Sequence, residues 1–147
     1  MSPNLQSSRR TILMADDDED DRDLAQDAFA DAGLDGQLRF VLDGQELLDY
    51  LRDDVASSAV ACPAIILLDL NMPRKDGREA LAEIKGDERL CDIPVVVLTT
   101  STDEEDIRRS YLLGASSFIA KPTTHAALVD VMRGLVNYWF DLVELPR

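Results

Sequence analysis

The chain has 147 residues, 46% of them hydrophobic, which suits a single domain with a substantial core. Its formal net charge of -14 would repel phosphate backbones and anionic membrane surfaces, so the composition argues against nucleic acid or membranes as partners and favours proteins and cations. The two cysteines, Cys62 and Cys91, are too few for a disulfide framework, and no apolar run resembles a signal peptide or a membrane helix, so we expect a soluble, cytoplasmic protein.

The first half of the chain predicts two strand and helix pairs after a Ser-rich leader, residues 1–10, that we expect to be disordered. "TILMA" is typical of a strand, and "DDRDLAQDAFADAG" has apolar residues at helical spacing until Gly33 ends the helix. "QLRFVL" predicts the second strand. In "DGQELLDYL", Asp43 and Glu46 have the spacing of a capping box at a helix start. A loop is expected from about Asp53 to Pro63.

The second half continues the same alternation. "AIILL" predicts a strand, "GREALAEIKG" a helix, and "IPVVVLTTS" a strand rich in β-branched residues. Thr102 is expected to begin the next helix, with Glu105 completing a capping box. "SSFIA" predicts the fifth strand, a last helix runs from about Thr124 toward Phe140, and residues 141–147 form a short extension.

Together these patterns predict five strands alternating with five helices. The third and fourth strands are apolar throughout, as expected for a parallel sheet that helices cover on both faces. The predicted fold is therefore a doubly wound α/β domain.

Polar residues stand where the predicted strands end. The first strand ends on Asp16 and Asp17, the third on Asp69, the fourth on Thr99, and the fifth runs into Lys121. Sites in open parallel sheets lie beyond the carboxyl ends of the strands, so these side chains are expected to share one crevice.

Three carboxylates in one crevice need a compensating charge, because two of them about 4 Å apart repel by roughly 4 kcal/mol at an effective dielectric constant near 20. Mg²⁺ supplies that charge and often completes its shell with phosphate oxygens. Asp69 would then be a nucleophile toward phosphorus. Lys121 would pair with a phosphoryl oxygen, Thr99 would donate a hydrogen bond to one, and Pro122 would help to direct Lys121 across the sheet end.

Four ordered motifs resemble the response-regulator receiver domain of two-component signalling systems: "ILMADDDEDD", "LLDLNMPRKDG", "VVVLTTS" and "FIAKP". The resemblance covers residues 11–140. It implies a flavodoxin-like five-stranded sheet with strand order 2-1-3-4-5 and a CheY-like phosphoprotein that acts as a signalling switch. Such a protein catalyses only its own phosphorylation and slow dephosphorylation.

The resemblance also implies the roles of individual residues. Asp69 accepts a phosphoryl group from a sensor histidine kinase, while Asp16, Asp17, Asp69 and the backbone carbonyl of Asn71 hold Mg²⁺. Thr99 and Lys121 respond to the phosphoryl group, and Phe118 stands where many relatives carry a switch tyrosine. Within the family, the ending "NYWFDLVELPR", the loop before Pro63 and "LTTS" resemble small stand-alone regulators paired with bacterial phytochromes.

The last helix carries two adjacent apolar rows that end in Tyr138, Trp139 and Phe140. One interpretation is a broad core face that closes the bottom of the sheet. We favour a partner surface, in particular a symmetric homodimer, because three consecutive aromatic residues span a wide arc of a helix.

Two other functions remain open at this point. A phosphohydrolase with an aspartyl intermediate would need a second acid shortly after Asp69, where this chain has Asn71. A flavodoxin-like nucleotide binder would need a Gly- or Ser/Thr-rich loop in place of "DDDEDD". We assign Asp18 to Asp21 to capping and solvation, His125 to a surface or capping position, and no reactive role to either cysteine.

Overall fold

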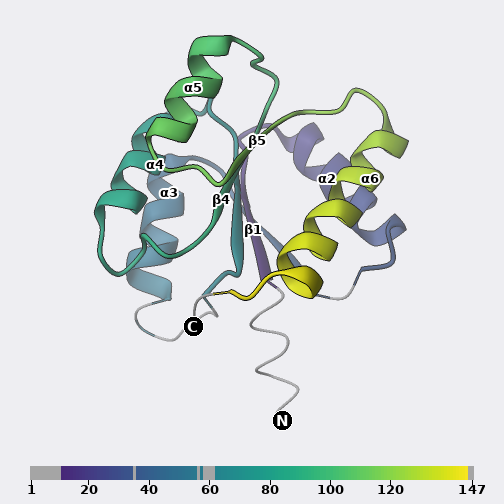
Figure 1. Cartoon of the computed structure of the whole chain (residues 1–147), viewed down its shortest axis with the longest axis horizontal. Helices are drawn as coiled ribbons and strands as arrows, with labels where there is room; N and C mark the ends of the chain where they lie inside the picture. Colours follow the sequence, from purple (N-terminus) through teal and green to yellow (C-terminus); the bar gives the residue numbers. More distant parts are fainter. Residues whose placement is uncertain (1–10, 35, 56, 58–61, 146–147) are drawn as a thin grey trace.

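The computed structural model describes residues 11–34, 36–55, 57 and 62–145 (Figure 1). The predicted leader, part of the loop before Pro63 and the last two residues lie outside these ranges. The strands are β1 (Thr11–Ala15), β2 (Gln37–Val41), β3 (Ile65–Leu68), β4 (Val95–Thr99) and β5 (Ser117–Ala120). They form one parallel sheet with the order β2-β1-β3-β4-β5, which confirms the predicted flavodoxin-like topology.

In the described part of the chain, five α-helices alternate with the strands: α2 (Glu19–Asp31), α3 (Gly44–Asp49), α4 (Gly77–Gly86), α5 (Glu104–Leu112) and α6 (His125–Val136). Two of them continue into wider π-helical turns, η1 (Tyr50–Asp54) after α3 and η2 (Asn137–Leu142) after α6. The last helix is therefore regular only to Val136, and the aromatic triple lies in η2. None of the helices in the described ranges has the length and apolar character needed to span a bilayer.

Aspartate side chains begin most of the helices. Asp43 accepts a hydrogen bond from the backbone N–H of Glu46 at 2.8 Å, as the capping-box spacing predicted. For α5 the predicted cap was wrong: Asp103, not Thr102, accepts from the N–H of Glu105 at 2.9 Å. The charged carboxylate is the stronger acceptor at a helix N-terminus, and it stands one residue nearer to the first turn.

The helices cover the two faces of the sheet separately, with α3, α4 and α5 on one face and α2 and α6 on the other (Figure 1). Strand residues alternate between them: Leu13 and Ala15 of β1 pack with α3 and α4, whereas Ile12 and Met14 pack with α2 and α6. Both sides of a central strand are therefore buried, which explains why these strands are apolar without a break.

Candidate functional site

Main-chain hydrogen bonds continue the sheet one residue past several strand ends and so fix the backbone of the site residues. The N–H of Asp16 donates to Val41 O at 3.1 Å, and that of Asp69 donates to Ala15 O at 3.1 Å. On the other side, Lys121 N donates to Thr99 O at 2.8 Å. The predicted site residues are thus held by the sheet itself, at its carboxyl edge.

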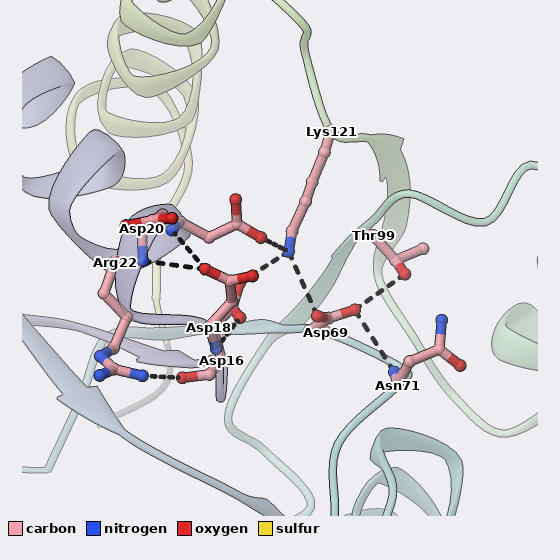
Figure 2. A network of polar contacts seen from close by, with 9 residues as sticks. Asp16, Asp18, Asp20, Arg22, Asp69, Asn71, Thr99 and Lys121 are labelled. Carbon is pink, nitrogen blue, oxygen red and sulfur yellow. Dashed lines mark hydrogen bonds and ion pairs between the residues drawn. The ribbon is translucent and has the colours of Figure 1, made fainter.

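Asp69 lies at the centre of the site and is nearly buried, with 8% of its surface exposed (Figure 2). The fully buried Thr99 hydroxyl donates to Asp69 Oδ1 at 2.9 Å, and the Asn71 N–H approaches the same oxygen at 3.4 Å. The other oxygen, Oδ2, lies 3.2 Å from Lys121 Nζ. Each oxygen of the carboxylate therefore faces a donor from a different strand end.

Lys121 reaches across the sheet edge into a group of carboxylates. Its Nζ lies 2.7 Å from Asp16 Oδ2 and 2.7 Å from Asp21 Oδ2, in addition to its contact with Asp69. Burial alone would lower the pKa of Lys121, but the hydrogen bonds to Asp16 and Asp21 outweigh it and raise the pKa above its ordinary value. The lysine is therefore charged and offsets part of the negative charge. Its peptide bond to Pro122 is trans.

Asp21 is a site residue that the sequence analysis missed, since it was assigned to capping and solvation. The N-cap of α2 is Asp18, which accepts from the N–H groups of Asp20 and Asp21. Asp21 is the third residue of α2, and helical side chains tilt toward the N-terminus, so its carboxylate leans back over the sheet edge. The signal lay in the spacing of five residues from Asp16, but it depends on the direction in which α2 leaves the strand.

Asp16 is completely buried, and burial raises its pKa although the hydrogen bonds from Lys121 and the Asp18 N–H oppose the shift. Arg22 Nη1 also donates to the main-chain carbonyl of Asp16 at 3.0 Å. The residue is held on three sides, which fixes the direction of its carboxylate.

A divalent cation fits this group of acids. Asp16, Asp17 and Asp69 each offer a carboxylate oxygen, and these oxygens lie within 4.8 Å of one another. The donors are all oxygens, which suits a hard cation such as Mg²⁺, Mn²⁺ or Ca²⁺. Asp17 is exposed, so an ion would have access from solvent. The carbonyl of Asn71 stays the predicted fourth ligand.

The loop after β3 folds tightly against the phosphoacceptor candidate. A Cβ atom on Gly77 would lie 2.2 Å from the carbonyl oxygen of Asp69, and the Gly77 N–H donates to Leu70 O at 2.8 Å. Arg74 in this loop has a φ of 64°, and its guanidinium lies 3.3 Å from Asp43 Oδ2. In the sequence, Gly77 is only the first residue of the predicted helix; the contact shows that glycine is needed because two stretches of main chain meet there.

Phe118, at the predicted switch position, packs half-buried against the core on the α3 and α4 face. Its backbone N–H donates to the hydroxyl of Tyr111 on α5 at 3.2 Å. The chain thus has a tyrosine hydroxyl next to the switch position, supplied by the preceding helix. Sequence reasoning did not identify Tyr111, because only the fold brings it to β5.

The remaining predictions concern residues outside the acid group. His125 begins α6 and pairs with Asp31 at 2.6 Å, in agreement with a surface position, while both cysteines are free thiols. In η2, Trp139 and Phe140 pack partly buried on the α2 and α6 face, whereas Tyr138 is 47% exposed. The core interpretation therefore accounts for two of the three aromatic residues.

Comparison with known proteins identifies the family. The model of the response regulator receiver domain matches residues 12–133. Response regulator Rcp1 of Synechocystis is 37% identical over 137 residues, which cover 93% of each protein.

Two solved structures are also similar. The phosphorylated cyanobacterial phytochrome response regulator RcpA is 40% identical, with a TM-score of 0.85 over 94% of this chain and 99% of that one. Response regulator RPA3017, described in red light signalling of R. palustris, is 37% identical, with a TM-score of 0.86 over 93% and 98%. The sheet, the acid group and the family match agree, and the chain belongs to the response regulator receiver domain family of signalling switches.

Proposed function

We propose that this protein is a response regulator that accepts a phosphoryl group on Asp69 from a sensor histidine kinase. The observation that carries the proposal is the arrangement around Asp69, whose oxygens face the Thr99 hydroxyl at 2.9 Å and the Lys121 ammonium at 3.2 Å. A hydroxyl and an ammonium so placed can receive the oxygens of a transferred phosphoryl group.

In the transfer, a carboxylate oxygen of Asp69 attacks phosphorus, and an acyl phosphate forms as the bond between phosphorus and the histidine nitrogen breaks. The electron pair of that bond stays on the imidazole ring of the kinase. Lys121 and Thr99 stabilise the oxygens of the phosphoryl group, and their hydrogen bonds to Asp69 already hold them in place. The protein promotes only this transfer and the slow hydrolysis of its product.

We assign Asp16, Asp17 and Asp69 as the ligands of a resident Mg²⁺, together with the Asn71 carbonyl. The three carboxylate oxygens within 4.8 Å of one another support this assignment, and the relative Rcp1 has a Mn²⁺-bound structure. When bound, the cation neutralises charge that develops on the transferred group. The chain's own contribution is to hold the three carboxylates together, with Asp16 and Asp69 buried and Asp17 on the solvent side.

The partner kinase is of the phytochrome type in this proposal, because RcpA is described as a phytochrome response regulator and RPA3017 as part of red light signalling. The signalling takes place in the cytoplasm. Phosphorylation shifts the population toward a form in which Thr99 and Phe118 are rearranged, and that form changes the association of the protein.

A homodimer through the C-terminal region is part of the proposal. A groove of about 420 Å³ lies between β5 and α6, and Ile119, Val131 and Trp139 contribute to its walls. Tyr138 lines the groove and is 47% exposed, and the nearby Leu142 of η2 is 69% exposed. Apolar surface of this kind is typical of a site of association.

The test of phosphoryl transfer is intact-mass measurement after incubation with Mg²⁺ and a small acyl phosphate such as acetyl phosphate. We expect a gain of one phosphoryl group that is stable to acid and labile to base, and that is absent with a chelator and in Asp69→Asn. Asp76→Asn is the matched control, because Asp76 lies in the same loop but caps α4 through the Glu79 N–H. Uptake that persists in Asp69→Asn, or no uptake by the wild type, would contradict the proposal.

A further inference from the structure

Asp21 has no assigned part in phosphoryl transfer, yet it makes one of the shortest ion pairs in the site. Its Oδ2 lies 2.7 Å from Lys121 Nζ, closer than the 3.2 Å between Lys121 and Asp69. The side chain of Lys121 is only 11% exposed and that of Asp21 is 34% exposed, so the pair is partly shielded from water. Ion pairs of limited exposure are less screened than those on the open surface.

The hydrogen bonds of Lys121 explain why three acids can share it. An ammonium group has three N–H donors, and Asp16, Asp21 and Asp69 accept one each. Asp21 and Asp69 therefore do not compete for one donor. A phosphoryl oxygen can take the donor that now faces Asp69 while the other two stay in place.

The three acids differ in whether they can also bind a divalent cation. Asp16 and Asp69 belong to the group of carboxylates that can hold a metal ion, whereas Asp21 does not. A divalent cation bound to Asp16 would compete with Lys121 for the negative charge of the Asp16 carboxylate, and it would also repel the nearby Lys121 ammonium. Asp21 is then the one of the three partners that stays fully available to the lysine.

From this geometry we infer that Asp21 is a positioning residue: it anchors the Lys121 ammonium on the α2 side when a divalent cation engages Asp16, so that one N–H stays directed toward Asp69. The inference deepens the proposed function and rests on it. Asp21 acts only through Lys121 and does not touch the transferred group.

The first test follows the lysine ammonium directly, by NMR of protein with ¹⁵N-labelled lysine, without phosphorylation. We expect a protected ammonium resonance, assigned to Lys121 by its loss in Lys121→Arg, in the metal-free wild type. It persists on titration with Mg²⁺ in the wild type and in Asp20→Asn, and it disappears during the titration in Asp21→Asn. Asp20 is the matched control because it lies in the same turn of α2 with the same charge.

The second test measures binding of beryllofluoride, a phosphoryl mimic, in the presence of Mg²⁺ by calorimetry. Loss of a charge-assisted anchor should weaken binding about tenfold in Asp21→Asn and less than about twofold in Asp20→Asn. In a Lys121→Ala background, Asp21→Asn should have no further effect, because the anchor has lost its partner. Asp21→Glu, which keeps the charge, should restore part of the affinity.

Three results would overturn the inference: a Lys121 resonance in Asp21→Asn that follows the wild type throughout the Mg²⁺ titration, equal weakening by Asp20→Asn and Asp21→Asn, or the same weakening without Lys121. Thermal unfolding identifies any variant that does not fold, and Asp21→Ala then replaces Asp21→Asn. A failure of the proposed function looks different, since the wild type itself would neither take up a phosphoryl group nor bind beryllofluoride, while the NMR result would stand.

Discussion

Lys121 contributes the one cationic side chain seen in contact with Asp69 within the described residues. We expect Lys121→Ala to lower the free energy of unfolding by about 3 kcal/mol in metal-free buffer, because the carboxylates of Asp16 and Asp69 lose their counter-ion in a poorly solvated setting. Added Mg²⁺ should raise the melting temperature of this variant more than that of the wild type, since the cation replaces the missing charge. Differential scanning calorimetry with and without Mg²⁺ measures both effects.

Lys121→Arg is the control for that experiment, because it keeps the charge and changes only the shape of the donor group. It should stay close to the wild type in metal-free stability. A Lys121→Ala variant as stable as the wild type in the presence of a chelator would contradict the expected charge balance.

Two glycines make an instructive pair of opposite predictions. Gly77→Ala should lower the free energy of unfolding by about 3 kcal/mol and reduce phosphoryl uptake, because the new Cβ would lie 2.2 Å from the Asp69 carbonyl and displace the main chain there. Gly134→Ala, in α6, should raise stability by about 0.5 to 1 kcal/mol, because no atom beyond its chain neighbours and the local backbone of the helix lies within 4 Å of the added methyl. Urea unfolding measures the free energy of unfolding of both variants. A neutral or stabilising Gly77→Ala would show that the loop can shift to accept the added methyl group.

At this scale the sequence predicts the residues that follow strands but not those that depend on the path of a loop or helix. Asp16, Asp69, Thr99 and Lys121 were found because a parallel sheet aligns its strand ends. Asp21 was missed because its position over the sheet edge depends on how α2 is oriented after its cap. The contact of Gly77 with Asp69 likewise requires the folded loop.

At the scale of elements, an aspartate joins the two helices that follow β3 and β4. Arg78 of α4 donates to Asp106 Oδ1 of α5 at 2.6 Å, and Ser101, in the loop after β4, donates to Asp106 Oδ2 at 2.6 Å. This bridge begins two residues after Thr99. It therefore connects the loop that adjoins the site to the helix over the β5 edge.

The bridge should stabilise the fold in a pH-dependent way. The hydrogen bond from Ser101, followed by that from Arg78, lowers the pKa of Asp106 below its ordinary value of 3.8. Such a contribution is fully present above that value and is lost as the pH falls through the lower pKa of the folded state. We expect Asp106→Asn to cost about 1 kcal/mol at neutral pH, with the difference from wild type vanishing in acid.

Chemical denaturation at a series of pH values measures this difference. Glu104→Gln is the control, because Glu104 lies in the same first turn of α5 and carries the same charge outside the bridge. A difference between Asp106→Asn and wild type that grows as the pH falls would mean that the charge of Asp106 is not what stabilises the bridge.

The elements themselves were largely predictable, because apolar periodicity distinguishes buried strands from amphipathic helices. The residues at which the elements begin and end were harder to predict. Thr102 and Asp103 are both good N-caps, and the capping-box spacing to Glu105 favoured Thr102, whereas the folded chain uses Asp103. The apolar residues around the π-helical turn after Val136 have the spacing that a regular α-helix would also have, so the sequence does not reveal the turn.

At the scale of the whole molecule, the open question for experiment is association through the C-terminal region. Leu142, 69% exposed, and Leu112 of α5, 74% exposed, are matched residues on different elements. If the groove beside α6 is the dimer interface, Leu142→Asp should weaken the dimer by at least about tenfold in sedimentation equilibrium, while Leu112→Asp should leave it unchanged. The reverse order of effects would move the interface to the α5 side.

The hydroxyl of Tyr111 has a consequence for how such molecules can meet. β5 is an edge strand of the described sheet. The unpaired backbone groups of an exposed edge strand can form hydrogen bonds with a strand of another chain. The Phe118 N–H on this strand is already taken by Tyr111, so an incoming strand would have to displace a tyrosine ring before its own carbonyl could bind. The Tyr111 hydroxyl thereby disfavours growth of the sheet from molecule to molecule at this point of β5.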